Sequence, residues 1–407
     1  MGPVTVLGVV TELRATERPT SGDTPELVAR VRDFARRELV PQQEHFDSFP
    51  EVPMALHDAF RDLGLANWWL PEHFGGMGIG MEESVDLVSE LAYGDAGFAF
   101  TTFISILGTT MLSLYGGEEI EERYLAPMAE SGSFCATVAS ERAAGSELTK
   151  LTTTAARSGE ELVLNGDKFF ATNAGFASFL VVIARAATNP AEHMAIVVPR
   201  ETAGVRIVKR WEMIGLRASG TYQVSFDRCR AATRDVLAGS GLRILEVGLN
   251  ASRILIASTA LGIARRIRDL CLEYARRKRV GDRPLLANAV FAAKLGQMEM
   301  DIDAMRHVCR GAARELDAIL GGHDAAEQLL RRGTLKSALT AKSFCGQTGW
   351  KIAGLGSEMF GGLGYTREMV IDKLVRDVRH VSIIEGGDDV LRDLVFQRYV
   401  QIEDMRV

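Results

Sequence analysis

An acidic residue follows an apolar run near the C-terminal end of the chain. Glu385 comes after residues 381–384, which are mostly apolar, and a Gly-Gly pair and two aspartates follow it. A carboxylate in apolar surroundings has a raised pKa and can act as a base at neutral pH. The alternative is that one of the aspartates caps a helix and that Glu385 is an ordinary loop residue. The local sequence alone favours that alternative.

Two other segments have residue types that suit a phosphate. Residues 140–147 contain small side chains and a Gly-Ser pair, through which backbone N–H groups can approach an anion. Residues 274–284 are densely basic, although the net charge of the chain is −6. The alternatives are a surface turn for the first segment and a solvated helix end for the second.

Aromatic and glycine-rich residues suggest further contacts. Phe170 and Thr172, with Asn173 beyond them, can face a flat ring and donate a hydrogen bond to it, or they can belong to an ordinary amphipathic strand. Residues 360–365 read Phe-Gly-Gly-Leu-Gly-Tyr but do not follow a strand, so they are no dinucleotide fingerprint. We expect a glycine-rich joint between helices, which a ligand can approach closely.

The period of the apolar residues divides the chain. Residues 26–130 show a helical period, with Leu27, Val31 and Phe34 on one face. Residues 134–235 show short strand-like runs, and Asn165-Gly166 predicts a tight hairpin turn between 161–164 and 167–172. Further strands are expected at 179–183, 195–198, 205–208 and 222–226, and helices at 242–279, 286–319, 325–354 and 388–402.

This order predicts an α+β fold that is mainly α. We expect a loose leader at 1–24, an N-terminal helical domain at 25–133, an antiparallel β domain at 134–238 and a C-terminal helical domain at 239–407. A chain of 407 residues is long enough for two or three packed units.

Composition excludes several classes of function. The 47% hydrophobic and 25% charged residues are typical of a soluble globular protein, and the acidic balance argues against nucleic acid as a partner. The five cysteines and seven histidines are scattered, which argues against a disulfide frame and a metal site. The longest apolar run, 254–264, is too short to span a membrane, and no secretory signal is visible, so we expect a cytoplasmic location.

Taken in order, these segments resemble the acyl-CoA dehydrogenase family from about residue 26 to residue 400. Residues 70–78, 140–147, 170–173 and 215–221 look like the family patterns P-E-x-x-G-G-x-G, T-E-P-x-A-G-S-D, W-I-T-N and G-x-R-x-S-x-T. The other matching positions are 90–94, Arg253, 274–275, 360–365, 376–377 and 385–386. The resemblance implies that the C-terminal domain is a four-helix bundle and that FAD lies between it and the β domain.

The resemblance assigns roles residue by residue. Ser140 matches the residue at the pyrimidine edge of the flavin, Thr172 the residue at its N5/O4 side, and Phe170 the aromatic packed on the ring. Ser146 matches a serine at the diphosphate, and Lys278 stands where the family has an arginine that contacts the diphosphate across a subunit interface.

Further matches concern the base and its surroundings. Glu385 matches the catalytic base and Arg253 an arginine that supports it. The remaining predicted contacts are Gly362 and Gly387 for the cofactor, and Ser252, Ile384 and Gly386 for the substrate.

The implied activity is α,β-dehydrogenation of an acyl thioester, carried by CoA or by an acyl carrier protein. Glu385 takes the α-proton while hydride passes to flavin N5, and hydrogen bonds to the thioester oxygen, one of them from the Glu385 N–H, stabilise the developing charge. The implied partners are an electron acceptor, such as an electron-transfer flavoprotein or oxygen, and copies of the chain in a homotetramer or homodimer. Alternatives are a flavin monooxygenase on the same fold, which needs no Glu385, and a non-catalytic relative without flavin.

Departures from the family cluster on the adenosine side of FAD. They are Lys278 for Arg, 281–282 for Phe-Gly, Ala289 and Glu358 for Gln, and Gly387 for Thr. Lysine and arginine are not equivalent at a diphosphate, so this half of FAD is expected to be held differently, by Arg277, Arg279 or Arg283, or weakly. Ile384 replaces the common Tyr before the base and alters the acyl pocket.

Overall fold

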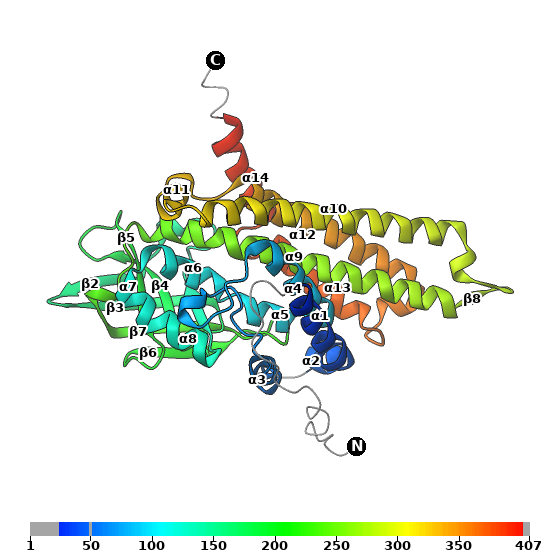
Figure 1. The fold of residues 1–407 in the computed structure, drawn as a ribbon, viewed down its shortest axis with the longest axis horizontal. Helices are drawn as coiled ribbons and strands as arrows, with labels where there is room; N and C mark the ends of the chain where they lie inside the picture. The colour runs from blue at the N-terminus through cyan, green and yellow to red at the C-terminus, as the bar shows by residue number, and fades with distance from the viewer. Residues whose placement is uncertain (1–23, 49–50, 402–407) are drawn as a thin grey trace.

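The computed structural model describes residues 24–48 and 51–401, and three regions follow one another along this chain (Figure 1). Short helices come first, the strands gather at one end of an elongated molecule, and long helices extend to the other end. The predicted α+β, mainly α class is therefore confirmed. The predicted leader lies outside the described residues except for Thr24.

The N-terminal region consists of helices that bury their predicted apolar faces. Leu27, Val31 and Phe34 of the first helix are at most 1% exposed. The helices are α1 (Thr24–Phe34), α2 (Gln43–Ser48), α3 (Met54–Asp62), α4 (Met81–Gly94), α5 (Ala96–Phe103), α6 (Ile106–Tyr115), α7 (Glu118–Ile120) and α8 (Ala126–Ser131). Between α3 and α4, a turn-rich loop passes through Gly75 and Gly78, which both have positive φ.

The middle region is one sheet whose strands alternate in burial. They are β1 (Cys135–Val138), β2 (Thr154–Ser158), β3 (Glu161–Thr172), β4 (Phe179–Ala186), β5 (His193–Pro199), β6 (Val205–Arg210) and β7 (Thr221–Ala232). Their order is β1-β4-β2-β3-β7-β6, with β5 on the other side of β4. Most pairs are antiparallel as predicted, but β1 and β2 both pair in parallel with β4.

The predicted hairpin at Asn165-Gly166 is wrong. These residues lie inside β3, where the register against β7 shifts, so the pair forms a bulge. Gly166 has φ 147°, and a Cβ there would come within 2.4 Å of the Thr153 hydroxyl. The glycine therefore serves a close strand contact, and the true turn between β2 and β3 includes Gly159, with φ 65°.

Long helices form the C-terminal region. They are α9 (Gly241–Arg277), α10 (Ala289–Leu320), α11 (Ala325–Arg332), α12 (Lys336–Met359), α13 (Ile371–Val378) and α14 (Asp388–Val395). The helix predicted at 325–354 is two helices, because the chain breaks at Gly333, with φ 67°. The strand pair β8 (Arg279–Val280) and β9 (Arg283–Pro284) projects from the end of α9 (Figure 1).

The central helix α9 packs against α4, α6, α10 and α12. Gly262 permits the closest of these approaches, since a Cβ there would lie 2.4 Å from the Ser89 carbonyl oxygen in α4. By length and hydropathy, the stretches Ala96–Tyr115 and Gly241–Arg277 could each cross a membrane, contrary to the expectation above. Their most apolar windows are 78% and 94% buried, so these are core helices of the fold.

A buried ion cluster joins the three regions. Lys373 Nζ on α13 lies 2.7 Å from Asp95 Oδ2 in the N-terminal region and 2.5 Å from Asp377 Oδ2 on its own helix. Asp377 Oδ1 also accepts a hydrogen bond from the N–H of Leu216, in the loop between β6 and β7, at 2.7 Å. These charged side chains are at most 3% exposed, so each depends on the others to offset its desolvation.

Replacing Lys373 with Met should therefore destabilise the protein strongly. Two carboxylates would stay buried without their cation, which typically costs about 3–5 kcal/mol. The fall in the denaturation midpoint measures this loss. Lys351→Met is the control, because Lys351 is 56% exposed and its pair with Asp301 is worth at most about 1 kcal/mol. Equal shifts for the two variants would contradict a stabilising role for the cluster.

Candidate active site

Glu385 lies in a tight turn between η11 (Arg379–Ser382) and α14. Its backbone has φ 51°, and the following Gly386 has φ 97°. A left-handed conformation costs a non-glycine residue about 1–3 kcal/mol, so surrounding contacts must hold it in place.

Helix α9 supplies two of these contacts. The Ser252 hydroxyl donates to Glu385 Oε2 at 2.7 Å. Arg253 Nε and Nη2 donate to the backbone carbonyl oxygen of Glu385 at 3.0 and 2.9 Å. Arg253 thus holds the main chain of the predicted base rather than its carboxylate, and Ser252, predicted as a substrate contact, touches the base itself.

The surroundings of Glu385 change its acidity. Burial raises the pKa of Glu385 above its usual value, and the Ser252 hydrogen bond and the charges of Arg253 and Lys342 only partly oppose this. Burial also lowers the pKa of Arg253 to about 10, which leaves the guanidinium charged at neutral pH. A carboxylate with a raised pKa beside fixed cations is suited to accept a proton.

His380 fixes the segment that leads to this turn. Its Nε2 lies 3.0 Å from the Thr259 hydroxyl on α9, and its Nδ1 lies 2.6 Å from the carbonyl oxygen of Asp377. Burial lowers the pKa of His380 to about 4, so the ring is neutral at neutral pH. The backbone N–H groups of Ile383 and Ile384 both bond the His380 carbonyl oxygen, which connects this anchor directly to Glu385.

A second group of predicted residues lies at the end of β3. Phe170 has φ 55° at a bulge in the strand and is 58% exposed, and the Trp211 ring lies 5.1 Å from it. The Ser140 carbonyl oxygen accepts the Phe169 N–H at 2.8 Å, which brings Ser140 beside the same strand. Thr172 Oγ1 lies 3.1 Å from Thr221 Oγ1.

A buried ion pair holds the loop that contains Ser140 and Ser146. Glu141 Oε1 lies 2.8 Å from Lys168 Nζ, and Glu141 Oε2 accepts from both the N–H and the hydroxyl of Thr152 at 2.6 Å. Lys168 also donates to the Ala139 carbonyl oxygen at 2.8 Å. The pair fixes the start of the loop on β3, while Ser146 itself is exposed.

The β6–β7 loop links the two groups. The N–H of Asn173, just after Thr172, bonds the Gly220 carbonyl oxygen at 2.8 Å, and Leu216 bonds Asp377 as described above. Gly215 packs directly on the backbone of Arg376, since a Cβ there would lie 2.5 Å from its carbonyl oxygen. The end of β3 is therefore connected through this loop to the helix that precedes Glu385.

Lys278 and Gly362 lie elsewhere. Lys278 is 25 residues beyond Arg253, at the end of α9, which is about 37 Å at 1.5 Å per residue. Gly362 is in η10 (Gly361–Tyr365), and a ring contact of 4.7 Å between Tyr274 and Phe360 places it at the same end. In one chain, these two predicted cofactor residues lie at the opposite end of the molecule from the strands (Figure 1).

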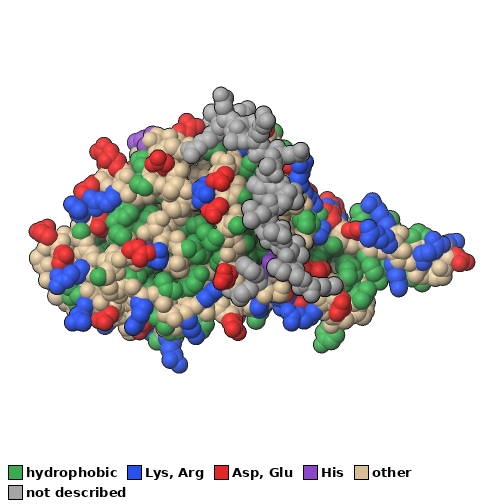
Figure 2. All heavy atoms as spheres, turned by 90° about the horizontal axis from the view of Figure 1, so that it is seen from below, with side chains coloured by type: hydrophobic (Ala, Val, Ile, Leu, Met, Phe, Trp, Pro, Cys, Tyr) green, Lys and Arg blue, Asp and Glu red, His purple; other side chains and the backbone are tan. Residues whose placement is uncertain are grey.

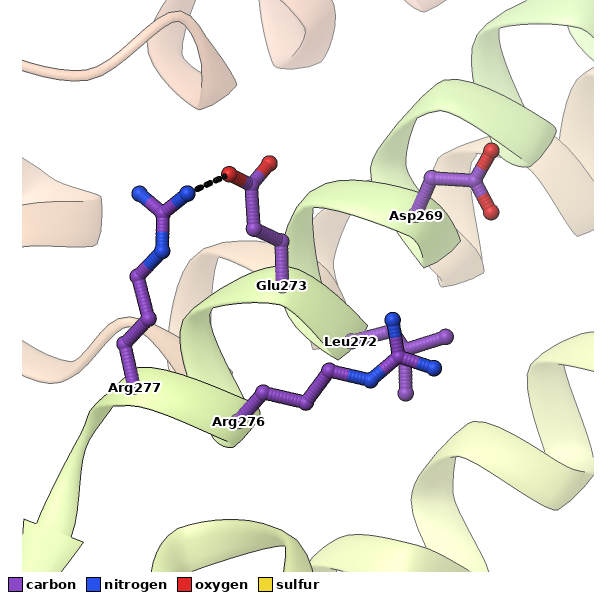
Figure 3. Close-up of a pocket in the computed structure, with 5 residues that line it drawn as sticks. All are labelled: Asp269, Leu272, Glu273, Arg276 and Arg277. Atoms are coloured by element: carbon purple, nitrogen blue, oxygen red, sulfur yellow. Dashed lines mark ion pairs between the residues drawn. The ribbon is translucent and has the colours of Figure 1, made fainter.

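This far end carries the basic cluster. The space-filling view shows Lys and Arg side chains along the narrow projection, with an acidic one at its tip (Figure 2). A hollow of about 460 Å³ on the last turns of α9 is lined by Asp269, Leu272, Glu273, Arg276 and Arg277. Figure 3 shows Arg277 turned back to pair with Glu273. Four charged side chains and Leu272, all from one helix, line the hollow, and none of the residues around Glu385 is among them.

Several residues of the site escaped the sequence analysis. Lys342, Lys168 and His380 each contact residues far away in the chain, and no sequence motif marks them. Trp211 lies next to Phe170 only because β6 and β3 both pair with β7. A lysine within an otherwise buried helix face was the one available signal for Lys342.

Comparisons with known proteins identify the family of the chain. Models of the N-terminal, middle and C-terminal domains of acyl-CoA dehydrogenases match residues 21–132, 136–229 and 239–400. An acyl-CoA dehydrogenase of Bacillus subtilis (strain 168) is 30% identical over 376 residues, or 91% of this chain and 96% of that protein.

Two solved structures share the fold. Butyryl-CoA dehydrogenase from Megasphaera elsdenii superposes with a TM-score of 0.84 at 24% identity, covering 94% of this chain and 99% of that one. A glutaryl-CoA dehydrogenase from Mycobacterium smegmatis, in complex with FADH2, superposes with a TM-score of 0.83 at 23% identity, covering 93% and 95%.

Fold, site and relatives together define an oxidoreductase that acts on CH–CH groups. The chain belongs to the acyl-CoA dehydrogenase family, whose members use FAD to dehydrogenate acyl thioesters.

The Glu141–Lys168 pair predicts a specific dependence of stability on pH. Burial alone would raise the pKa of Glu141, but the charge of Lys168 and the hydrogen bonds outweigh it and lower the pKa from 4.5 to about 2. A carboxyl with a lowered folded-state pKa stabilises the fold above about pH 4.5 and loses this effect as pH falls toward 2. The melting temperature of Glu141→Gln should therefore lie well below that of wild type at pH 6, and the gap should narrow below pH 4.5.

Glu147→Gln is the matched control, because Glu147 is on the same loop and its side chain is 64% exposed. It should melt close to wild type throughout. A gap between wild type and Glu141→Gln that stays constant or widens on acidification would show that the carboxylate is not stabilised in this way.

Proposed function

We propose that this protein removes the α-proton of an acyl thioester with Glu385 as the base, in an α,β-dehydrogenation. The observation that carries the proposal is the Glu385 carboxyl itself, with its raised pKa, its bond from Ser252 and its main chain held by Arg253. A base with a raised pKa takes a proton from carbon more readily than an exposed glutamate does.

The Glu385 backbone supplies a second function. Among the described residues, its N–H has no hydrogen-bond partner, while both guanidinium contacts go to its carbonyl oxygen. We assign this N–H to the thioester carbonyl oxygen, where negative charge develops as the α-proton leaves. Arg253 fixes the direction of the peptide and so aligns the N–H and the carboxylate on one substrate.

The residues at the end of β3 fit a flavin. Phe170 presents an exposed ring, and Trp211 Nε1 and Ser219 Oγ are buried without a hydrogen-bond partner in the part of the chain that the structure describes. A Cβ at Gly145 would meet nothing within 4 Å, so a ligand can approach the backbone there. We propose that Ser140, Thr172 and Phe170 hold the ring, and Ser146 the diphosphate. When bound, the flavin supplies the two-electron acceptor.

We propose that two copies complete each cofactor site. The cofactor contacts expected of Lys278 and Gly362 lie at the far end of the bundle from the other cofactor residues, so they can serve only a flavin bound to another copy. Exposed apolar side chains on the bundle, including Val290 and Met300 on α10 and Trp350 on α12, provide a surface for such a pairing. This supports the predicted homotetramer or homodimer.

The thioester is proposed to be carried by CoA or by an acyl carrier protein, and the electrons to leave through an electron-transfer flavoprotein or to oxygen. Two other predicted contacts flank Glu385 and Gly386 in the turn: Ile384, predicted to contact the acyl group, precedes them, and Gly387, predicted to contact the cofactor, follows them. The smaller Ile384, which packs against the core in place of the family's Tyr, leaves a differently shaped acyl pocket.

Glu385→Gln tests the proposal. The amide keeps the size of the side chain but cannot accept the α-proton, so anaerobic bleaching of the bound flavin by acyl-CoA should slow by about 10²- to 10⁴-fold. Stopped-flow absorbance measures this rate. Asp393→Asn, an exposed residue of α14, is the control and should react like wild type. Unimpaired bleaching by Glu385→Gln would exclude Glu385 as the base, and reduction only by NAD(P)H with an oxygenated product would favour a monooxygenase.

A second test concerns the adenosine half of the cofactor. Lys278→Met should weaken binding of FAD to the apoprotein about tenfold, because one charge-assisted contact to the diphosphate is lost. Lys278→Arg should restore it. Riboflavin has neither phosphate nor adenosine and serves as the control ligand, whose affinity should not change. Equal effects of Lys278→Met on FAD and riboflavin would contradict the assignment of Lys278.

A further inference from the structure

A buried lysine lies directly beneath the catalytic turn. Lys342 on α12 is fully buried, and its Nζ donates to the backbone carbonyl oxygen of Gly386 at 2.7 Å. Gly346, one turn further along the same helix face, allows this approach, since a Cβ there would lie 2.8 Å from the Ser382 hydroxyl. Helix α12 therefore packs its backbone against the segment before Glu385 and its lysine against the segment after it.

Two cations hold two successive carbonyl groups. Arg253 from α9 binds the carbonyl oxygen of Glu385, and Lys342 from α12 binds that of Gly386. Both residues have positive φ, at 51° and 97°. In this conformation the two carbonyl oxygens point toward the buried helices. Each accepts a charge-assisted hydrogen bond there, one from α9 and one from α12, which stabilises the strained turn.

Ionisable groups face Lys342 from each neighbouring element. Arg253 lies on α9, Glu385 and Asp388 on the turn and at the start of α14, and His380 on η11. Burial and the repulsion of Arg253 lower the pKa of Lys342 to about 8, against the attraction of Glu385 and Asp388. Lys342 is thus mostly protonated at neutral pH and loses its charge as the pH rises through about 8.

We propose that Lys342 is a positioning residue for the base: it fixes the left-handed turn through the Gly386 carbonyl and keeps the Glu385 carboxylate charged. This inference rests on the proposed role of Glu385. In this proposal Lys342, which is fully buried with its Nζ bound to the Gly386 carbonyl oxygen, makes no direct contact with substrate or flavin. It acts through the peptide that follows the base and through its charge, while Arg253 acts through the preceding carbonyl.

Three variants of Lys342 separate the effect of its hydrogen bond from the effect of its charge. Lys342→Met removes both the donor and the charge in a side chain of similar length, whereas Lys342→Gln keeps an N–H donor without the charge. Lys342→Arg keeps the charge. Lys351→Met, on the same helix but 56% exposed, is the matched control. Each variant, loaded with flavin, is mixed anaerobically with acyl-CoA between pH 5.5 and 9.5.

Loss of the charge should raise the pKa of Glu385, so the acidic limb of the flavin-reduction profile moves to higher pH in Lys342→Met and Lys342→Gln. At pH 7 the maximal reduction rate should fall about tenfold to hundredfold for Lys342→Met and less for Lys342→Gln. Lys342→Arg should return the acidic limb toward wild type. The advantage of wild type over Lys342→Gln should shrink above pH 8, where Lys342 itself becomes neutral.

A second readout needs no catalysis. In a double-mutant cycle on melting temperature between Lys342→Gln and Glu385→Gln, the two changes should be non-additive, because each charge affects the other. Additive effects, together with a reduction profile that matches Lys351→Met, would overturn the positioning role. If Glu385→Gln itself leaves reduction intact, the proposed base fails instead. If Lys342→Met does not fold, Lys342→Gln and Lys342→Arg still decide the outcome.

Discussion

The proposed activity depends on a buried, charged and correctly oriented carboxylate at Glu385. An isolated buried carboxylate would take up a proton, and a glutamate with positive φ would relax to an ordinary turn. At Glu385 both tendencies are opposed from outside the local chain. Ser252 bonds the carboxylate, Arg253 holds its main-chain carbonyl, and Lys342 holds the next one. Ser252 and Arg253 come from the long buried helix α9, and Lys342 comes from its neighbour α12.

The need to orient Glu385 also accounts for the buried ion pairs and hydrogen bonds that connect the three regions. A base is useful only if the substrate and its electron acceptor are placed beside it to within a fraction of an ångström. The Lys373 cluster connects α13 to the N-terminal helices and, through Asp377, to the β6–β7 loop. That loop in turn bonds the end of β3, where Phe170 and Thr172 lie. Buried polar bonds rather than apolar packing alone therefore set the relation of the base to the proposed flavin ring.

The sequence predicted the α–β–α order because the period of apolar residues changes twice, and the buried face of α1 follows that period directly. The sequence-based prediction was wrong where a residue serves a contact with a distant part of the chain. Gly166 suited a hairpin turn, yet its missing side chain accommodates Thr153 inside a continuous strand. Glu385 stood out only through an ordered series of motifs, since its own neighbours suited a helix cap. Lys342 and Lys168 are buried against partners far away in the chain, and Lys373 has one partner on its own helix, Asp377, and one far away, Asp95. The sequence also could not predict that the expected cofactor residues lie at opposite ends of the folded molecule, because spacing along a sequence does not give distance in space.

The most direct test of Glu385 as the base separates proton removal from oxidation. A thioester whose β-carbon is replaced by sulfur can lose its α-proton but has no β-hydride to transfer, so exchange of that proton in D2O, followed by NMR, reports the base alone. We predict that the flavin-loaded wild type exchanges the α-proton rapidly and that Glu385→Gln exchanges it at least about a hundredfold more slowly. Equal exchange by the two proteins would contradict the account, because another group would then be removing the proton.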